Sequence, residues 1–112
     1  MVRDLCRFDI VLLRLNPSVG AEVRKTRPCL MVSPDEMNKH ISTVIVAPMT
    51  SVVRAYPSRV PIRFDGRDGE VALDQLRTID KARIVRRVGR SSSATSAKVA
   101  AVLVEMFARD NE

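Results

Sequence analysis

A chain of 112 residues in which 46% of the side chains are hydrophobic and 29% are charged has the size and composition of one ordinary globular domain. No apolar run approaches the ~18 residues that a membrane-spanning helix needs, and residues 1–7 lack the apolar segment of a signal peptide, so we expect no membrane association and a cytoplasmic location. The net charge of +6 is carried mainly by arginine, which favours an anionic partner, either nucleic acid or an acidic protein segment.

Cysteine and histidine, the usual ligands of transition metals, are scarce. The chain has two cysteines, Cys6 and Cys29, and one histidine, His40. A cytosolic cysteine pair normally stays reduced, so we interpret Cys29 as a small core residue and His40 as a surface residue. The chemistry is therefore expected to need no cofactor, and either no metal or a hard cation held by carboxylates.

Two apolar runs near the start of the chain predict strands that are joined by a long loop. The first, Phe8–Leu15, is rich in branched residues, and Asn16–Gly20 then supplies turn chemistry. The loop continues to Arg27, and connections of about ten residues are often functional. The second strand is predicted over Pro28–Ser33. Because proline restricts the preceding residue to extended conformations, Arg27 is expected at the junction of the loop and the strand.

A short helix and a buried strand are predicted next. Ser33 is a candidate N-cap, with Pro34 at the first helical position and Glu36 three residues after the cap. Residues Thr43–Met49 are nearly continuously apolar and predict a central strand, in which Pro48 marks a bulge or the exit of the strand.

Thr50 and Ser51 place two hydroxyl groups at the end of this strand. Taken alone they would simply begin a turn, since the loop Val52–Pro57 follows. Thr50 nevertheless resembles Arg27 in its position, because each is a polar residue where a core strand meets a loop. We therefore expect both groups at the rim of one sheet.

The second half of the chain predicts shorter strands. Arg59–Phe64 alternates basic and apolar residues, and Pro61 suggests an edge strand whose outward arginines either follow phosphates or form a solvated face. A glycine-punctuated turn, a strand, a polar connection and a last strand are predicted in turn over Asp65–Gly69, Glu70–Leu73, Asp74–Lys81 and Ala82–Gly89.

A C-terminal helix completes the predicted fold. One serine within Ser91–Thr95 caps a helix that runs to about Arg109. Apolar residues at helical spacing are expected to dock on the sheet, namely Val99, Val102, Leu103, Met106 and Phe107. The chain thus predicts a mainly β (α+β) domain over residues 1–112, a small, strongly curved antiparallel barrel with a C-terminal helix.

Several short segments stand in a characteristic order over nearly the whole chain: Asp9-Ile10-Val11, Asn16-Pro17, Gly20-Ala21-Glu22, Arg27-Pro28, Pro48-Met49-Thr50 and Asp74-Gln75-Leu76-Arg77-Thr78-Ile79-Asp80-Lys81. Together they resemble the MazF/PemK family of bacterial toxin ribonucleases. The resemblance implies an SH3-like barrel of the plasmid-maintenance-toxin type. It further implies a homodimer that cuts single-stranded RNA at short sequences, and a cognate antitoxin whose acidic, flexible tail lies across the RNA groove.

The resemblance also implies roles for particular residues. The functional arginine of the family falls on Arg27 and its functional threonine on Thr50. The loop glutamate corresponds to Glu22, and the glutamine found near bound RNA corresponds to Gln75. One departure is Phe8, which stands where the family usually has a glycine and is expected to alter packing at that edge.

These residues suit RNA cleavage in which a 2′-hydroxyl attacks its own phosphate and leaves a cyclic phosphate and a 5′-hydroxyl. Arg27 would stabilise the phosphorane with two parallel hydrogen bonds. Thr50 would donate its hydroxyl to the same phosphorane. Glu22 would act either as the general base or as a partner that orients Arg27.

Further residues are expected to bind the RNA rather than to react. The basic side chains before the second strand suit phosphates, and polar groups near the other strand ends suit base edges and hydroxyl contacts. The expected RNA-binding residues are Arg24, Lys25, Ser51, Gln75 and Arg77. The recognised sequence is expected to depend on the loops 18–26, 51–58 and 65–69.

Two other functions compete with this interpretation. A gyrase-poisoning toxin shares the same barrel but binds a protein and has no nuclease site, so it does not need both Arg27 and Thr50. A non-catalytic RNA-binding module would bind RNA and leave it intact.

Overall fold

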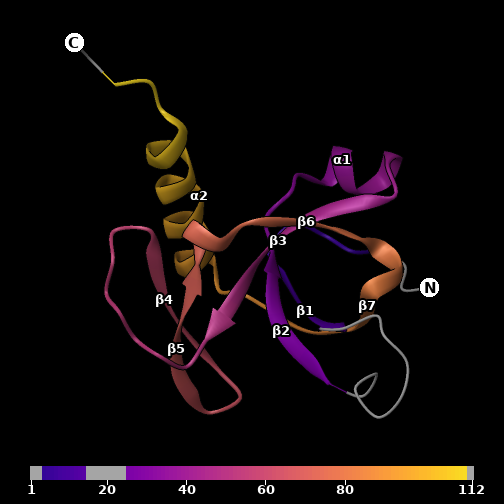
Figure 1. Cartoon of the computed structure of the whole chain (residues 1–112), viewed down its shortest axis with the longest axis horizontal. Helices are drawn as coiled ribbons and strands as arrows, with labels where there is room; N and C mark the ends of the chain where they lie inside the picture. Colours follow the sequence, from indigo (N-terminus) through magenta and orange to yellow (C-terminus); the bar gives the residue numbers. More distant parts are fainter. Residues whose placement is uncertain (1–3, 15–24, 111–112) are drawn as a thin grey trace.

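Antiparallel strands are the main elements of the computed structural model, which describes residues 4–14 and 25–110 (Figure 1). Within these residues seven strands form one sheet. In chain order they are β1 (Asp9–Arg14), β2 (Thr26–Met31), β3 (Thr43–Thr50), β4 (Arg59–Phe64), β5 (Arg67–Ala72), β6 (Arg77–Asp80) and β7 (Ile84–Arg90). The helices are α1 (Asp35–His40) and α2 (Ser93–Phe107), and the 3-10 turns η2 (Leu73–Gln75) and η3 (Lys81–Arg83) flank β6. The predicted mainly β architecture with a C-terminal helix is therefore confirmed.

Strand β3 connects the two parts of the sheet. The strand order is β4-β5-β3-β2-β1-β7, and β6 also pairs with β3. The earlier residues of β3 pair with β2 and β6, whereas Met49 and Thr50 pair with β5. Pro48, opposite Cys29, is the last β3 residue paired with β2. The strand therefore changes partners where proline was expected to mark its exit.

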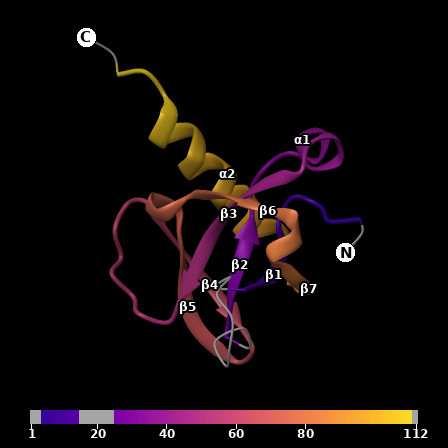
Figure 2. The same cartoon turned by 45° about the vertical axis from the view of Figure 1, so that its right-hand side comes forward.

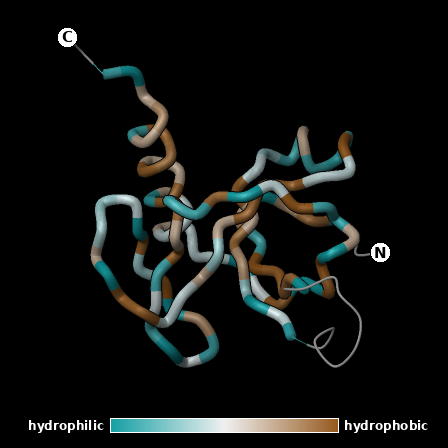
Figure 3. Tube along the Cα trace, viewed as in Figure 1, coloured by the Kyte–Doolittle hydropathy of each residue, from teal (hydrophilic) through white to brown (hydrophobic). Residues whose placement is uncertain are grey.

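The strands in the middle of the sheet are buried on both faces. One core cluster includes Ile10, Leu30 and Val99, and a second includes Val11, Cys29 and Met31. Successive residues of a strand point to opposite faces, so a strand between two clusters must be apolar throughout. Figure 3 shows the resulting hydrophobic stretches along these strands. Cys29 is 1% exposed, which confirms it as a core residue.

The first two strands differ slightly from their predicted bounds. Leu15 and the loop to residue 24 lie outside the described residues. Strand β2 begins at Thr26, so Arg27 is the second residue of the strand rather than the residue before it. Both Thr26 and Arg27 are exposed, which hides this part of the strand from a search for apolar runs.

The predicted polar connection over Asp74–Lys81 is wrong, because it contains strand β6. Its residues pair with β3, with Ile79 opposite Val44 and Arg77 opposite Val46. Ile79 is the one buried residue of the four, so the segment has no alternation that could reveal a strand. The last strand, β7, accordingly begins at Ile84 instead of Ala82.

Strands β4 and β5 form a tight hairpin. The bounds and the edge position of β4 were predicted correctly. The turn is shorter than predicted, because only Asp65 and Gly66 separate the strands, with φ of 54° and 75°. Two left-handed residues match the right-handed twist of a two-residue hairpin. Strand β5 therefore begins at Arg67 and ends at Ala72.

The prediction that the arginines of β4 face outward is wrong for Arg59. Its side chain is only 7% exposed, and its Nε lies 2.7 Å from Asp74 Oδ1. One terminal nitrogen lies 3.3 Å from Glu70 Oε1. Arg63 does face solvent, where it pairs with Asp68 at 2.9 Å.

Glu70 ties the loop after β3 to strand β5. This carboxylate is 2% exposed and accepts backbone N–H groups of Arg54 at 3.0 Å and Ala55 at 2.8 Å. The bond from Arg54 is the main cause that lowers the pKa of Glu70 from its usual 4.5, and the bonds from Ala55 and Arg59 add to it. Arg59 is in turn the main cause that lowers the pKa of Asp74.

Helix α1 is positioned by a serine that does not cap it. The predicted N-cap Ser33 is wrong, because the N-cap is Pro34. The Ser33 hydroxyl instead accepts the Ile45 N–H at 3.0 Å and donates to Asn38 Oδ1 at 2.5 Å, which joins α1 to β3. His40 is exposed as predicted and lies 3.3 Å from Glu36.

Helix α2 docks on the sheet as far as Val102 and Leu103, which pack against the first core cluster, but not over its last turn. Ser92 caps it by accepting the Thr95 N–H at 3.1 Å, as the serine-rich segment predicted. Val99 is buried, but Phe107 is 72% exposed and Met106 is 37% exposed, so the predicted stripe does not dock along its whole length. Figures 1 and 2 show the end of the helix extending beyond the sheet. No helix of the described residues is long and apolar enough to cross a membrane.

The chain enters β1 through a strained residue. Phe8 has a φ of 74°, a left-handed conformation that costs a non-glycine residue about 1–2 kcal/mol. Its ring packs against the first core cluster and lies 5.0 Å from the Arg7 guanidinium carbon. The next residue, Asp9, is 1% exposed and pairs with Arg87 and Arg90. The glycine that the resemblance implies at position 8 would adopt this backbone conformation without strain.

The lowered pKa of Glu70 predicts how stability depends on pH. Because the folded state favours the ionised carboxylate, its contribution is complete above pH 4.5 and is lost as the pH falls through the lower pKa of the folded state. We expect Glu70→Gln to reduce the free energy of unfolding at pH 7, and the difference from the parent chain to shrink toward pH 3. Urea unfolding at both pH values measures this, with the exposed Glu105→Gln as control. A difference that stays constant with pH would contradict the prediction.

Candidate functional site

A cleft opens where strands β2 and β3 separate. In the paired part, Met31, Leu30 and Cys29 lie opposite Val46, Ala47 and Pro48. Two further steps of the same register would place Arg27 opposite Thr50. Strand β3 instead turns toward β5, where Thr50 lies opposite Glu70. Arg27 and Thr50 therefore stand on the two sides of the fork between the strands.

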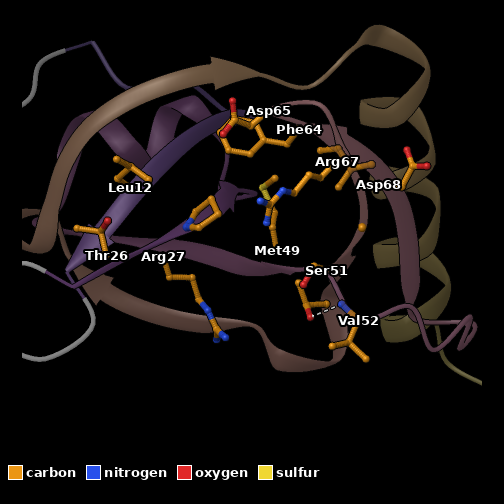
Figure 4. Close-up of a pocket in the computed structure, with 14 residues that line it drawn as sticks. Leu12, Thr26, Arg27, Met49, Ser51, Val52, Phe64, Asp65, Arg67 and Asp68 are labelled. Carbon is orange, nitrogen blue, oxygen red and sulfur yellow. Dashed lines mark hydrogen bonds between the residues drawn. The ribbon is translucent and has the colours of Figure 1, made fainter.

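Arg27 and Thr50 also share one face of the sheet. Side chains of a strand alternate, so Arg27 projects on the same side as Cys29, and Thr50 on the same side as Pro48. Cys29 and Pro48 are directly opposite each other and therefore define one face. Figure 4 shows Arg27 and the Ser51–Val52 segment on opposite sides of an open space. The expectation that both groups lie at one rim agrees with this register.

The cleft has a volume of about 630 Å³. Arg27 and Pro28 line it from β2, and Thr50–Val52 from the end of β3. The β4–β5 hairpin forms the opposite wall through Asp65 and Arg67–Gly69. The wall thus combines cationic, hydroxyl and carboxylate groups around apolar side chains.

Thr50 is held in a defined orientation. Its hydroxyl oxygen accepts the Val52 N–H at 3.1 Å, which leaves the hydroxyl hydrogen available to an acceptor in the cleft. Strand β5 also lies very close to the Thr50 backbone. A Cβ added to Gly69 would lie only 2.3 Å from the Thr50 carbonyl oxygen. Glycine at position 69 therefore allows the strands to approach as they do.

Arg27 is exposed and forms no ion pair with any residue within 4–14 or 25–110. It belongs to a group of positive charges around Cys29. Burial raises the pKa of the Cys29 thiol to about 11, while Arg27, Arg77 and Arg83, in that order, act to lower it. Cys29 therefore stays a neutral thiol.

The other predicted residues differ in where they lie relative to the cleft. Ser51 lines the cleft with Thr50. Arg77 and Gln75 are exposed and do not line it, although Arg77 lies opposite Val46 and so shares the face of Arg27. Lys25 is exposed immediately before β2. The predicted residues Glu22 and Arg24 lie outside the described residues.

Individual residues of the β4–β5 hairpin were missed as site residues. The sequence marks residues 65–69 as a loop that influences recognition, but Arg67 and Asp68 belong to β5 and form a wall of the cleft. Asp68 pairs with Arg63, so its charge is partly balanced. The Asp65-Gly66 pair was the available signal, because such a pair predicts a two-residue turn. In the described part of the chain, no three residues of the types His, Cys, Asp and Glu come together in a group that could hold a metal ion.

Comparisons with known proteins agree with this architecture. The family model described as PemK-like, MazF-like toxin of type II toxin-antitoxin system matches residues 6–107. Endoribonuclease EndoA of Bacillus subtilis is 32% identical over 88 residues, which cover 73% of this chain and 76% of the relative.

Solved structures show the same fold. An endoribonuclease in complex with its cognate antitoxin from Mycobacterial species has a TM-score of 0.80 at 21% identity, and the match covers 97% of this chain and 100% of that chain. A chain of a MazE-MazF structure from Deinococcus radiodurans has a TM-score of 0.76 at 25% identity, over 95% of this chain and 97% of that chain. The likeness covers the sheet and α2 alike.

The close approach between Gly69 and the Thr50 backbone can be tested by adding a methyl group at position 69. We expect Gly69→Ala to reduce the free energy of unfolding by about 3 kcal/mol, the upper end of typical overpacking costs, because the new methyl group meets backbone atoms of Thr50. Gly89→Ala is the matched control, since its Cβ would meet only side-chain atoms at 3.8 Å and 3.9 Å. Urea unfolding of both variants decides, and equal stabilities would contradict the prediction.

Proposed function

We propose that this chain, which belongs to the PemK-like, MazF-like toxin family of type II toxin-antitoxin systems, is an endoribonuclease that cuts single-stranded RNA at specific short sequences without a metal ion. A curated relative at 32% identity is named an endoribonuclease, which supports this activity. The observation that carries the proposal is the placement of Arg27 and Thr50 on one face of the fork between β2 and β3. Residues 1–112 would form a single toxin domain.

The proposed reaction is a displacement at phosphorus within the RNA. The 2′-hydroxyl oxygen bonds to the adjacent phosphorus as its proton departs, and the bond from phosphorus to the 5′-oxygen breaks. The leaving oxygen takes up a proton, so the products are a 2′,3′-cyclic phosphate and a 5′-hydroxyl. The protein must therefore move two protons and stabilise a phosphorane with additional negative charge.

Arg27 and Thr50 suit the stabilising role. A guanidinium can donate two parallel hydrogen bonds to phosphate oxygens, and Arg27 has no ion-pair partner among the described residues. The Thr50 hydroxyl already accepts a bond from Val52, so it is oriented as a donor. A preorganised donor of this kind contributes about 3–4 kcal/mol to the transition state. The two groups would contact the phosphorane from the two sides of the fork.

The proton that leaves the 2′-hydroxyl needs a base. We assign the role of this base to Glu22, the carboxylate of the loop before β2. In the alternative assignment, Glu22 orients Arg27 through an ion pair. Arginine itself is a poor base, because its pKa exceeds ~12. Both tasks need the ionised carboxylate, so Glu22→Gln should lower the cleavage rate in either case, and a parent rate in this variant would exclude both.

RNA binding is assigned to polar groups around the fork. Arg24 and Lys25 would neutralise phosphates that flank the scissile one. Ser51 would contact the RNA inside the cleft, and Gln75 and Arg77 would contact base edges. This assignment is supported by the exposure of Lys25, Gln75 and Arg77 and by the face that Arg77 shares with Arg27.

We further assign a cognate antitoxin as the inhibitor. A related endoribonuclease has been solved in complex with its cognate antitoxin. The net charge of +6 suits an acidic, flexible antitoxin tail that competes with RNA for the same face. The active form would be a cytoplasmic homodimer.

The catalytic pair predicts separable variants. We expect the parent chain to cut an RNA oligonucleotide in EDTA and to leave 5′-hydroxyl ends. Arg27→Ala and Thr50→Ala should fold and bind the RNA but cut it at least ~100-fold more slowly, because each removes a donor to the phosphorane. Thr50→Ser retains the hydroxyl and should retain most of the rate. Cleavage by Arg27→Ala at the parent rate in EDTA would show that the mechanism is wrong.

Two parallel measurements separate the competing functions. Incubation with gyrase and supercoiled DNA tests for a gyrase poison, which would inhibit gyrase and leave RNA intact. A gel-shift measurement tests for a binding module, which would retard RNA without cutting it. Sequencing the 5′-hydroxyl ends then identifies the recognised sequence.

A phosphate contact of Lys25 predicts a change in salt dependence. We expect Lys25→Ala to weaken RNA binding and to reduce the slope of log K against log salt by about 0.7, the value for one phosphate contact on a single strand. Fluorescence anisotropy on Thr50→Ala protein, across a range of salt concentrations, measures this without cleavage. Lys98→Ala, exposed on α2, is the matched control. A slope identical to that of the control would contradict the contact.

A further inference from the structure

The loop between β3 and β4 carries exposed apolar side chains beside the cleft. Val52 is 51% exposed, Val53 is 61% exposed and Tyr56 is 50% exposed. Figure 3 shows a hydrophobic segment in this loop. Tyr56 is the only tyrosine of the chain, and no step of the proposed cleavage uses it.

The ring of Tyr56 rests on a fixed guanidinium. The guanidinium carbon of Arg59 lies 5.1 Å from the ring centroid. Two nitrogens of Arg59 contact the Asp74 carboxylate, at 2.7 Å and 3.3 Å, and a third contact of 3.3 Å reaches Glu70. These contacts hold the Arg59 side chain in place, and its guanidinium covers one side of the Tyr56 ring. Half of the Tyr56 surface stays open to solvent.

The backbone that carries Tyr56 is also fixed. The Tyr56 carbonyl oxygen accepts the Arg59 N–H at 3.0 Å. The preceding residue, Ala55, has a left-handed φ of 57° and donates its N–H to the buried Glu70 carboxylate at 2.8 Å. A strained residue held by a buried acceptor indicates that this loop conformation is imposed by its surroundings. The ring is thus presented in a defined position.

Tyr56 lies over the same face of the sheet as the catalytic pair. Thr50 and Pro61 both lie opposite Glu70, so these three side chains share a face. Arg59 is two residues from Pro61 in β4 and projects on that face too. Tyr56 is six positions after Thr50 in the chain, which limits the distance between their Cα atoms to about 22 Å. A bound RNA of several nucleotides can therefore contact both.

We propose that Tyr56 is a stacking platform for one nucleobase of the single-stranded RNA, at a position flanking the scissile phosphate. Exposed aromatic rings beside a basic groove bind unpaired bases in this way. This proposal rests on the proposed ribonuclease function. It adds a residue that helps to determine which RNA is bound. Arg59 backs the ring, and Glu70 fixes both Arg59 and the loop.

The first experiment compares cleavage by variants of the loop. On an oligonucleotide that carries the recognised sequence, Tyr56→Ala should lower kcat/KM by roughly 5- to 100-fold, the range for loss of one base stack. Tyr56→Phe keeps the ring and should stay near the parent rate. Val53→Ala removes another exposed apolar side chain of the same loop and serves as the matched control.

The second experiment detects the stack directly. RNA that carries 2-aminopurine at successive positions is titrated with Thr50→Ala protein, which should not cut it. We expect stacking to quench the fluorescence at one position, and the double variant Thr50→Ala, Tyr56→Ala to abolish this quenching. Tyr56→Leu, which keeps apolar bulk over Arg59, should behave like Tyr56→Ala and serves if the alanine variant does not fold.

The outcomes separate the two proposals. A parent chain that cuts no RNA would overturn the ribonuclease function, and the fluorescence titration then still decides whether Tyr56 stacks on a base. Cleavage and fluorescence that do not change on removal of the ring would overturn the platform alone. Weaker binding of an acidic peptide with unchanged RNA binding would also overturn it, because the loop would then serve the antitoxin.

Discussion

The change of partners along β3 is the constraint from which the candidate site follows. Up to Pro48 the strand pairs with β2, and from Met49 onward it pairs with β5. If the first register continued, Arg27 and Thr50 would be an ordinary cross-strand pair with no space between them. Because β3 turns away, the same two residues face a cleft but remain on rigid strands. Groups that are held in this way lose little conformational freedom when they bind a charged transition state.

A buried carboxylate connects this fork to the neighbouring loop. Glu70 lies opposite Thr50 and is almost fully enclosed, a position in which an ionised group is costly unless its hydrogen bonds are satisfied. The backbone N–H groups of Arg54 and Ala55 and the guanidinium of Arg59 supply these bonds. The same bonds that offset the burial of the charge also determine the path of the loop. The position of the loop after β3 is therefore fixed by Glu70 of strand β5.

Local patterns predicted the elements better than their contacts. Alternation predicted β4 residue for residue, and apolar runs located β1, β2 and β3, but β6 was missed because Ile79 is its only inward side chain. Alternation also marked Arg59 as outward, since a periodic pattern does not show that a loop covers that face. Helical spacing placed Phe107 on the docking stripe but does not show where the sheet ends. Arg27 and Thr50 were predicted from strand ends and from family resemblance, whereas the separation of β2 and β3 that sets them on two sides of a cleft depends on distant contacts.

The central position of β3 also bears on how such a protein is controlled. Strand β3 pairs with β2, β5 and β6, so we expect the strand to belong to a cooperative unit that opens only with the whole fold. Amide protons of its paired residues should accordingly be among the slowest to exchange. A site built at the end of such a strand has no low-energy way to disassemble itself while the rest stays folded. We therefore expect control to come from a molecule that covers the candidate site or from removal of the whole chain.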